Sequence, residues 1–414
     1  MSGIIFILVF ISIFGPKVGL IDIAVLGYCF IGFILLSTIK SIKYPKEYVV
    51  LCMLTVILLL YSIIVALFTD SNDLYFVLRN FRAFIAIGIL GLIFYNIRMP
   101  IVELVNITII VLLIHSLSIL IEMTFPVLKI YLSPIVGYDK EILPLRAFGL
   151  IGGYDGSGYL CVIGAILSLV MFHYTGFFKY IAFSFIFFIS VFFVSRMNMV
   201  FMFIVIIISI RVWLTRRKVN LITKFIIISF SIVGGYLFIN LIYPILYYTI
   251  PLINQYFIGT SIKTQNYSIS YGSGSQVYLL DTMWKIPESI AGFIFGTGLL
   301  PEGSDIGYVK VLFMTGIIGI LISIFYYGYI IRALKRKLII IDKYRLNTYD
   351  SYINNIAKGF IVIISLLFLY NFKNLFLFSR TFHELIIILF FTFLADVNRP
   401  KVFNSDNNTK LYPS

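Results

Sequence analysis

The sequence predicts an all-α polytopic membrane protein with about twelve transmembrane helices, built as a single integral membrane domain over residues 1–414. Hydrophobic residues make up 61% of the chain and charged residues only 12%, whereas a water-soluble domain needs roughly a quarter of its residues charged. The runs rich in Ile, Leu and Phe often approach ~20 residues, the length that crosses ~30 Å of hydrocarbon. A bilayer therefore solvates this chain better than water does.

Each long apolar run is expected to form a helix, because in lipid the backbone polar groups must be hydrogen-bonded within the segment. The first run lacks a basic flank and a small-residue cleavage site, which favours a first helix over a signal peptide. In chain order, the expected spans lie at about 2–14, 20–38, 48–68, 76–96, 101–124, 158–176, 180–194, 197–214, 225–243, 307–331, 359–372 and 379–396.

The connections between these spans alternate between two chemically different sets. The formal net charge of +14 lies in one set, which includes a basic loop at 332–358 and the C-terminal tail. Basic residues in short loops remain on the cytoplasmic side. We expect a bacterial inner-membrane protein, and the charge pattern predicts that both of its termini lie in the cytoplasm. This pattern indicates membrane topology and no binding of nucleic acid.

Two connections on the opposite, periplasmic side are long, at 126–157 and 244–306. Both are rich in Gly, Pro, Tyr and Ser but also contain aromatic anchors. Long loops in compact proteins are usually functional or disordered, and the anchors favour ordered, functional loops. No internal repeat is visible, which weakens the interpretation as a transporter with inverted halves.

Arginines on the periplasmic side are the most informative candidates for chemistry. A guanidinium offers a rigid fork of donors that suits phosphate. Arginines near helix ends also snorkel to the interface at little cost, and the two interpretations carry about equal weight for any single residue. The candidates are Arg146, Arg196 and Arg380, together with Arg79 and Arg82 on one helix face.

Polar and aromatic residues near these arginines are secondary candidates. Asp305 follows a glycine-rich turn, where it would either cap the next helix or bind a sugar hydroxyl and accept its proton. Trp284 and Tyr271 could stack on sugar rings, or belong to the aromatic belt of the interface. His115 lies inside a span and is expected to pack in the bundle. Neither cysteines nor histidines show metal-ligand spacing, so we expect no metal and no cofactor.

Four stretches taken together resemble O-antigen polymerases of the Wzy type. That family shares a superfamily with the O-antigen ligases and is related to the polymerases of peptidoglycan. The stretches are Arg146-Ala-Phe-Gly149, Val194-Ser-Arg196, the segment from Trp284 through Gly296-Thr-Gly298 and Asp305 to Thr315-Gly-Ile-Ile-Gly319, and Lys373 to Arg380. The resemblance lies in the joint order of these stretches on a twelve-span background.

The resemblance implies a GT-C-like helical bundle acting as a metal-independent glycosyltransferase. It would move the growing O-polysaccharide from undecaprenyl diphosphate onto a new lipid-linked repeat unit at the periplasmic face. A chain-length regulator protein would be a further partner. By match to the family motifs, Arg146, Arg196 and Asp305 take catalytic roles. Substrate binding falls to Arg380, Lys373, Arg82, Arg79, Tyr271 and Trp284.

Three other functions compete with this one. An O-antigen ligase would use the same donor, but ligases characteristically place a histidine in the large periplasmic loop, and residues 244–306 contain none. A flippase for lipid-linked repeat units would share the helix count and charge, yet such proteins generally have short loops. A polymerase of capsule or exopolysaccharide would work by the same mechanism in a different cell.

Overall fold

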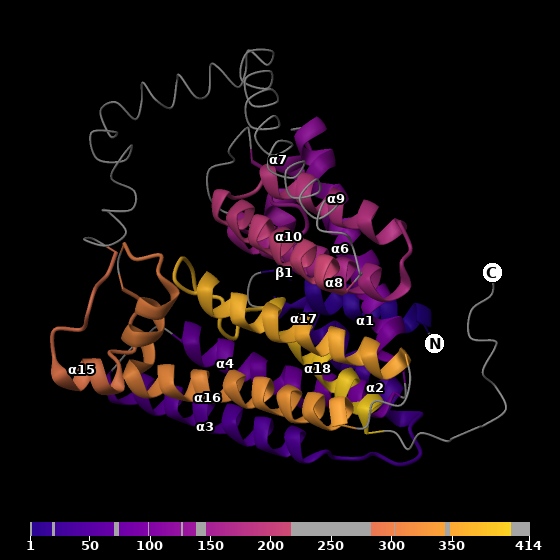
Figure 1. The fold of residues 1–414 in the computed structure, drawn as a ribbon. Helices are drawn as coiled ribbons and strands as arrows, with labels where there is room; N and C mark the ends of the chain where they lie inside the picture. The colour runs from indigo at the N-terminus through magenta and orange to yellow at the C-terminus, as the bar shows by residue number, and fades with distance from the viewer. Residues whose placement is uncertain are drawn as a thin grey trace, which may run out of the picture.

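The structure, a computed structural model, describes residues 2–18, 21–69, 74–97, 99–125, 127–137, 146–216, 283–301, 303–343 and 348–398. These residues are almost entirely helical (Figure 1). The one sheet among them is a two-stranded antiparallel ribbon of two residues per strand. The prediction of a helical membrane protein is confirmed at this level.

The N-terminal part begins with helix α1 (Ser2–Phe14), the ribbon strands β1 (Lys17–Val18) and β2 (Ile21–Asp22), and α2 (Ile23–Ser37). The Asp22 carboxylate caps α2 by accepting the N–H groups of Ala24 and Val25, as Asp commonly does at a helix start. Next come α3 (Lys46–Phe68) and α4 (Tyr75–Ala86), which continues through the π-helical turn η1 (Ile87–Gly91) into α5 (Leu92–Asn96).

A second group of helices lies above the first in Figure 1 and contains α8, α9 and α10. In chain order these elements are α6 (Ile101–Thr124), α7 (Val127–Val136), α8 (Tyr154–Thr175), α9 (Lys179–Phe192) and α10 (Arg196–Arg216). Helix α8 packs extensively on α9 and also on α6, α10 and α17, which explains why thirteen of its residues from Ser157 to Met171 are buried.

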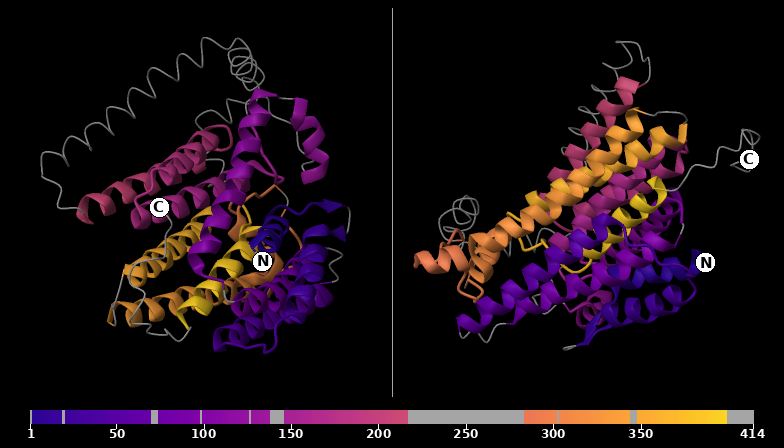
Figure 2. Two further views of the ribbon diagram at one scale, coloured as in Figure 1. Left: turned by 90° about the vertical axis from the view of Figure 1, so that its right-hand side faces the viewer. Right: turned by 90° about the horizontal axis from the view of Figure 1, so that it is seen from below.

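The C-terminal part consists of α15 (Ile290–Phe295), α16 (Gly307–Lys343), α17 (Thr348–Tyr370) and α18 (Phe382–Val397). Every residue of α18 from Phe382 to Ala395 is buried, against α1, α5, α6, α17 and η1. A helix that is hydrophobic on all sides is expected in the centre of a large bundle, and α18 occupies that position. The two views of Figure 2 show the long helices running beside one another around it.

Helix α16 is broken at Gly316, whose φ of 63° and ψ of −171° are not helical. A Cβ there would lie 2.2 Å from the carbonyl oxygen of Ile294, so only glycine fits. Carbonyl groups near the break find new donors: the N–H of Thr297 bonds Phe313 at 2.6 Å, and the Tyr61 hydroxyl lies 3.2 Å from the Thr315 oxygen. The break therefore seats the Gly-Thr-Gly turn after α15 against α16.

The helix ends gather at two opposite ends of the bundle. At one, which we call the basic end, Ser2 bonds Glu103, the N–H of Ile101 bonds Asp396, and Lys337 bonds Asn398. At the other, the arginine end, Asp22 pairs with Arg82, the Thr381 hydroxyl donates to the Ile13 carbonyl, and the Ala147 N–H donates to the Phe193 carbonyl. This division matches the two sets of connections predicted from charge.

Six helices of the described part are long and apolar enough to cross a membrane: Lys46–Phe68, Tyr75–Asn96, Ile101–Thr124, Tyr154–Thr175, Gly307–Ile341 and Tyr352–Tyr370. Other apolar helices, such as α1 with 13 residues, are shorter than the ~20 residues needed to span hydrocarbon. The expected span at 225–243 lies outside the described residues.

Two predicted loops contain more helix than the sequence suggested. The segment 332–358, expected as a loop, is helical as far as Lys343 and again from Thr348. Its Lys, Arg, Leu and Ile residues are acceptable helix formers, and no Gly or Pro stops α16 at the end of its apolar run. In the segment 126–157, α7 and the first turn of α8 are helical. Of 244–306, the structure describes 283–301 and 303–306, where α15 is the one helix.

Candidate functional site

The loop 371–381, between α17 and α18, is the centre of the arginine end. The Asn371 side-chain oxygen accepts the N–H groups of Phe376 and Leu377 and folds the loop back on itself. From α4, Arg79 donates to the carbonyl groups of Leu375 and Leu377 at 2.8 to 3.0 Å. Arg79 therefore has main-chain partners and holds the loop in place.

Two residues of this loop have a backbone conformation that is rare for residues other than glycine. Phe378 has a φ of 51° and Thr381 a φ of 78°. Such a conformation costs of order 1 kcal/mol or more for each residue and persists where the surroundings enforce it. Here the Phe378 N–H donates to the Tyr327 hydroxyl and the Thr381 hydroxyl donates to the Ile13 carbonyl. The strained turn aims the intervening Arg380 away from α18.

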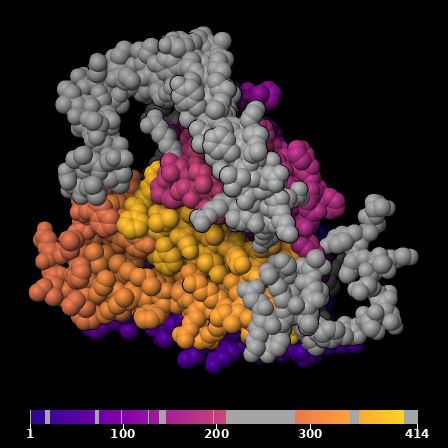
Figure 3. Space-filling model, in the orientation of Figure 1, coloured from indigo at the N-terminus to yellow at the C-terminus, as the bar shows by residue number. Residues whose placement is uncertain are grey.

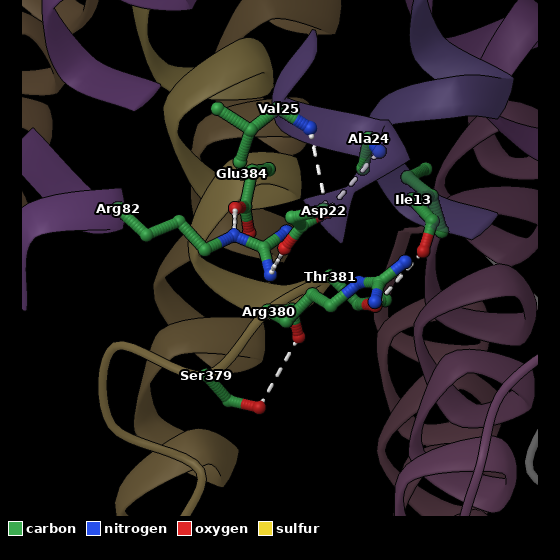
Figure 4. Close-up of polar contacts among 9 residues, drawn as sticks. All are labelled: Ile13, Asp22, Ala24, Val25, Arg82, Ser379, Arg380, Thr381 and Glu384. Atoms are coloured by element: carbon green, nitrogen blue, oxygen red, sulfur yellow. Dashed lines mark hydrogen bonds and ion pairs between the residues drawn. The ribbon is translucent and has the colours of Figure 1, made fainter. Parts of the chain in front are cut away.

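Arg82 is bound between two carboxylates (Figure 4). Its Nη1 lies 2.6 Å from Asp22 Oδ2 and its Nε 2.7 Å from Glu384 Oε1. Glu384 is 1% exposed, so removing Arg82 would leave a buried, uncompensated charge. The pairing joins β2, α4 and α18 and gives Arg82 a structural role at this end.

Arg380 lies next to this cluster and is differently placed. In Figure 4 its side chain extends past Thr381 toward the Ile13 backbone, away from the pair of Arg82 with Glu384. Burial lowers the pKa of the Arg380 guanidinium, while Asp22 and Glu384 oppose that change. Arginine nonetheless stays protonated at neutral pH. Arg380 thus supplies a partly desolvated positive charge.

Lys373 connects the loop 371–381 to the N-terminus of α8. Its ammonium lies 2.8 Å from Asp155 Oδ1, which also accepts the Ser195 hydroxyl at 2.6 Å. The Asn198 amide bonds the Asp155 carbonyl. Asp155 therefore brings together the loop with Arg380, the start of α8 and the turn before α10.

Arg146 lies at the start of the irregular segment that leads into α8. Its guanidinium is partly buried and sits over the ring of Tyr154 at 5.6 Å. The neighbouring Ala147 N–H donates to the Phe193 carbonyl. Arg196 is the first residue of α10, one residue after Ser195, and its side chain lies outside the described part. The structure thus brings the Arg146 segment and the turn before Arg196 together.

The segment 283–306 carries the remaining candidates along one edge of the molecule, orange in Figure 3. Trp284 is 42% exposed, and its ring lies 6.3 Å from that of Phe372, itself 50% exposed and next to Lys373. Asp305 is 62% exposed and lies 3.7 Å from the ammonium of Lys310. Tyr271 lies outside the described residues. Trp284 is thus placed against the loop 371–381.

Neither of two cavities inside the described bundle is lined by a predicted site residue. The larger, of about 350 Å³, lies between α8, α10 and α17, and contains His173, Ser209, Asn355 and Lys358 among apolar walls. The smaller, of about 10 Å³, is lined by apolar side chains of α16, α17 and α18. In the described part of the chain, no group of three or more His, Cys, Asp or Glu residues could hold a metal ion.

Sequence reasoning missed the acidic partners. Asp22 and Glu384 bind Arg82, and Asp155 binds Lys373, so these three carboxylates hold two of the predicted cations. A signal existed for two of them: Asp22 directly precedes an apolar helical run, the position of an N-cap, and a lone carboxylate in an apolar helix such as Glu384 calls for a partner. Asp155 carried no comparable signal.

Comparison with known proteins adds no relative. No family model matches the sequence, and a search of curated proteins finds no match. The functional argument therefore rests on the residues and their arrangement.

Proposed function

We propose that this protein is a polysaccharide polymerase of the O-antigen type. It would transfer the growing glycan from a lipid diphosphate to the terminal sugar of a new lipid-linked repeat unit at the periplasmic face. We also propose that the chain belongs to the Wzy family, which it resembles, and that it crosses the inner membrane twelve times in a GT-C-like arrangement. Both termini would lie in the cytoplasm.

The observation that carries the proposal is the ion pair of Lys373 with Asp155. It ties the loop that bears Arg380 to the N-terminus of α8, eight residues after Arg146 along the chain. Together with the bonds of Arg79 to the same loop, of Ser195 to Asp155 and of Ala147 to Phe193, it joins the four stretches that carry the predicted cations at one end of the bundle. A diphosphate donor needs such a gathering of positive groups, more so as negative charge builds on the leaving group.

The predicted cations divide into structural and available groups. Arg79 and Arg82 are engaged with carbonyl groups and carboxylates. Among the described residues, Arg146 has a ring contact with Tyr154 and Arg380 has longer-range interactions with Asp22 and Glu384. A guanidinium that makes only a ring contact or longer-range interactions keeps N–H donors that can bind phosphate oxygens. Arg146 and Arg380 are therefore the proposed diphosphate ligands, with Arg196 as a third.

The acceptor sugar would bind at the edge formed by Trp284, Phe372 and Asp305. Exposed aromatic rings offer apolar faces against which a sugar ring can stack, and an exposed carboxylate can orient a hydroxyl and accept its proton. Attack by that hydroxyl on the anomeric carbon forms the new glycosidic bond and breaks the bond to the diphosphate. The hydroxyl proton goes to Asp305 or to water.

The test is the glycan ladder of a strain that lacks this protein and is complemented with variants. Arg146→Ala and Arg380→Ala should leave a single repeat unit on the lipid core. Lys337→Ala, which removes a cation at the basic end, should keep the full ladder. An unchanged ladder in both arginine variants would refute the site assignment. In the deletion strain, core alone with lipid-linked polymer would indicate a ligase.

One observation favours a flippase as the second candidate function. The pairing of Arg82 with Asp22 and Glu384 places ionisable groups within the bundle, and ionisable residues inside membrane proteins often mark transport pathways. If the protein is a flippase, its deletion should leave the lipid core without added repeat units. Single lipid-linked repeat units should then accumulate on the cytoplasmic side. Single repeats already joined to core in the deletion strain would exclude it.

A further inference from the structure

The main chain that follows Arg146 is held by a buried carboxylate from a different helix. Glu122 of α6 is 0% exposed, and its Oε2 accepts the N–H of Phe148 at 3.0 Å and that of Gly149 at 3.2 Å. Its other oxygen, Oε1, has no hydrogen-bond partner. One carboxylate oxygen therefore fixes two successive peptide groups next to Ala147.

A buried histidine holds the next peptide group. The N–H of Leu150 donates to His115 Nδ1 at 3.0 Å, so Nδ1 carries no proton and, in the neutral ring, Nε2 does. Nε2 lies 2.9 Å from the Ser157 hydroxyl, which in turn donates to the Phe148 carbonyl. The bonds form a directed chain from Leu150 through His115 and Ser157 back to Phe148.

The direction of this chain excludes a nucleophile and base pair. For His115 to activate Ser157, its Nε2 would have to be the unprotonated nitrogen, yet it is the one that donates. The Ser157 hydroxyl donates its hydrogen bond to the Phe148 carbonyl. Both residues are 0% exposed. His115 and Ser157 therefore act on the segment and have no access to substrate.

Gly149 is required for the close approach of the segment to the histidine. Its φ is +63°, and a Cβ would lie 2.7 Å from His115 Cε1 and 2.8 Å from Nδ1. Only glycine allows both this backbone conformation and this contact. On its other side, His115 stacks on Phe14 at 5.1 Å, next to the Ile13 carbonyl that accepts Thr381. The histidine thus lies between the Arg146 segment and the Arg380 loop.

We infer that Glu122, His115 and Ser157 are positioning residues that fix residues 147–150 and so set where Arg146 presents its guanidinium. This rests on the proposed role of Arg146. A guanidinium that stabilises developing charge works best when it is already in place. Because one Glu122 oxygen makes both bonds, the side-chain oxygen of glutamine can accept them in its place, while the electrostatic attraction of Glu122 to the buried Lys129 is lost.

The experiment combines hydrogen exchange of residues 147–150 in lipid nanodiscs with the glycan ladder in cells. Glu122→Ala should speed exchange of Phe148 and Gly149 by about tenfold or more, as expected when an N–H loses an ordinary hydrogen bond, and should shorten the ladder. Glu122→Gln should keep the slow exchange of Phe148 and Gly149 and the full ladder. Glu103→Ala, on the same helix at the basic end, is the matched control and should alter neither. Ser157→Ala is a milder variant that keeps the side-chain volume nearly constant.

The outcomes separate this inference from the proposed function. Suppose that Glu122→Ala or Ser157→Ala speeds exchange but keeps a full ladder, while Arg146→Ala abolishes polymer. That result overturns the positioning role and leaves the proposed function intact. Unchanged exchange in both variants also overturns it. If Arg146→Ala keeps a full ladder, the proposed role of Arg146 fails and the inference fails with it, whatever the exchange data show. Loss of ladder in Glu122→Gln with normal exchange shows that the charge itself is needed and contradicts the positioning role.

Discussion

Lys373 Nζ lies 2.8 Å from Asp155 Oδ1, although the two residues are 218 positions apart in the chain. The lysine side chain is 39% and the aspartate 20% exposed, so solvent screens part of the attraction. Because Ser195 also bonds Asp155, the carboxylate keeps one partner when the lysine is removed. The pair fixes the distance between two segments more than it stabilises the fold.

A double-mutant cycle of Lys373→Met and Asp155→Asn should give a coupling free energy of only about 0.5–1 kcal/mol, because the pair is partly exposed. The measurement is thermal or denaturant unfolding in detergent for the two single variants and the double variant. The ladder should shorten in each single variant even where unfolding changes little. A coupling near zero would show that the ion pair does not join the two segments.

Arg82 and Glu384 should respond much more strongly. Arg82→Ala leaves the buried Glu384 without its cation and should destabilise the protein by about 3–5 kcal/mol. The double variant with Glu384→Gln and Arg82→Met should recover much of that loss, since the charge of the buried Glu384 is gone and only the more exposed Asp22 loses its cation. Unfolding midpoints in detergent measure both effects. Equal midpoints for Arg82→Ala and the double variant would contradict the assignment of a buried ion pair.

Gly316 should tolerate no side chain, whereas another glycine of the same helix should. Gly316→Ala puts a Cβ 2.2 Å from the Ile294 carbonyl oxygen at a φ of 63°, so we expect a marked loss of folded monomer. Gly328 has open space around its Cβ position, and Gly328→Ala should be neutral or stabilise by up to about 1 kcal/mol. Size-exclusion chromatography after heating compares the two. Similar profiles would show that α16 is not broken at Gly316.

The sequence was sufficient to predict the helical membrane class, because apolar run length and scarce charge follow directly from the solvent that the chain requires. It also separated the two ends of the bundle, since charge bias acts on each loop independently. Helix boundaries were less predictable at α16, where a basic helix continues past the apolar run to Lys343. A hydrophobicity pattern carries no information on where such an extension stops.

The candidate site was predicted in composition but not in its pairings. Which carboxylate neutralises Arg82, and which carbonyl groups bind Arg79, depends on contacts between segments about 300 residues apart. His115 was expected to be a packing residue, and its hydrogen bonds to Leu150 and Ser157 follow only from the three-dimensional arrangement. Sequence patterns reveal local periodicity and do not specify such long-range partners.

Trp284 should influence substrate use without influencing stability, because its ring is 42% exposed and sits on the rim of the loop 371–381 beside Phe372. Losing one stacking surface should weaken acceptor binding by about 1 kcal/mol, or roughly fivefold. Trp284→Ala should therefore shorten the polymer and raise the concentration of lipid-linked acceptor needed for half-maximal elongation in vesicles. Ile290→Ala removes an even more exposed apolar side chain, 80% exposed, from the same segment and should leave elongation unchanged. If both variants elongate alike, the edge beside Phe372 does not hold the acceptor, and the aromatic residue serves the membrane interface instead.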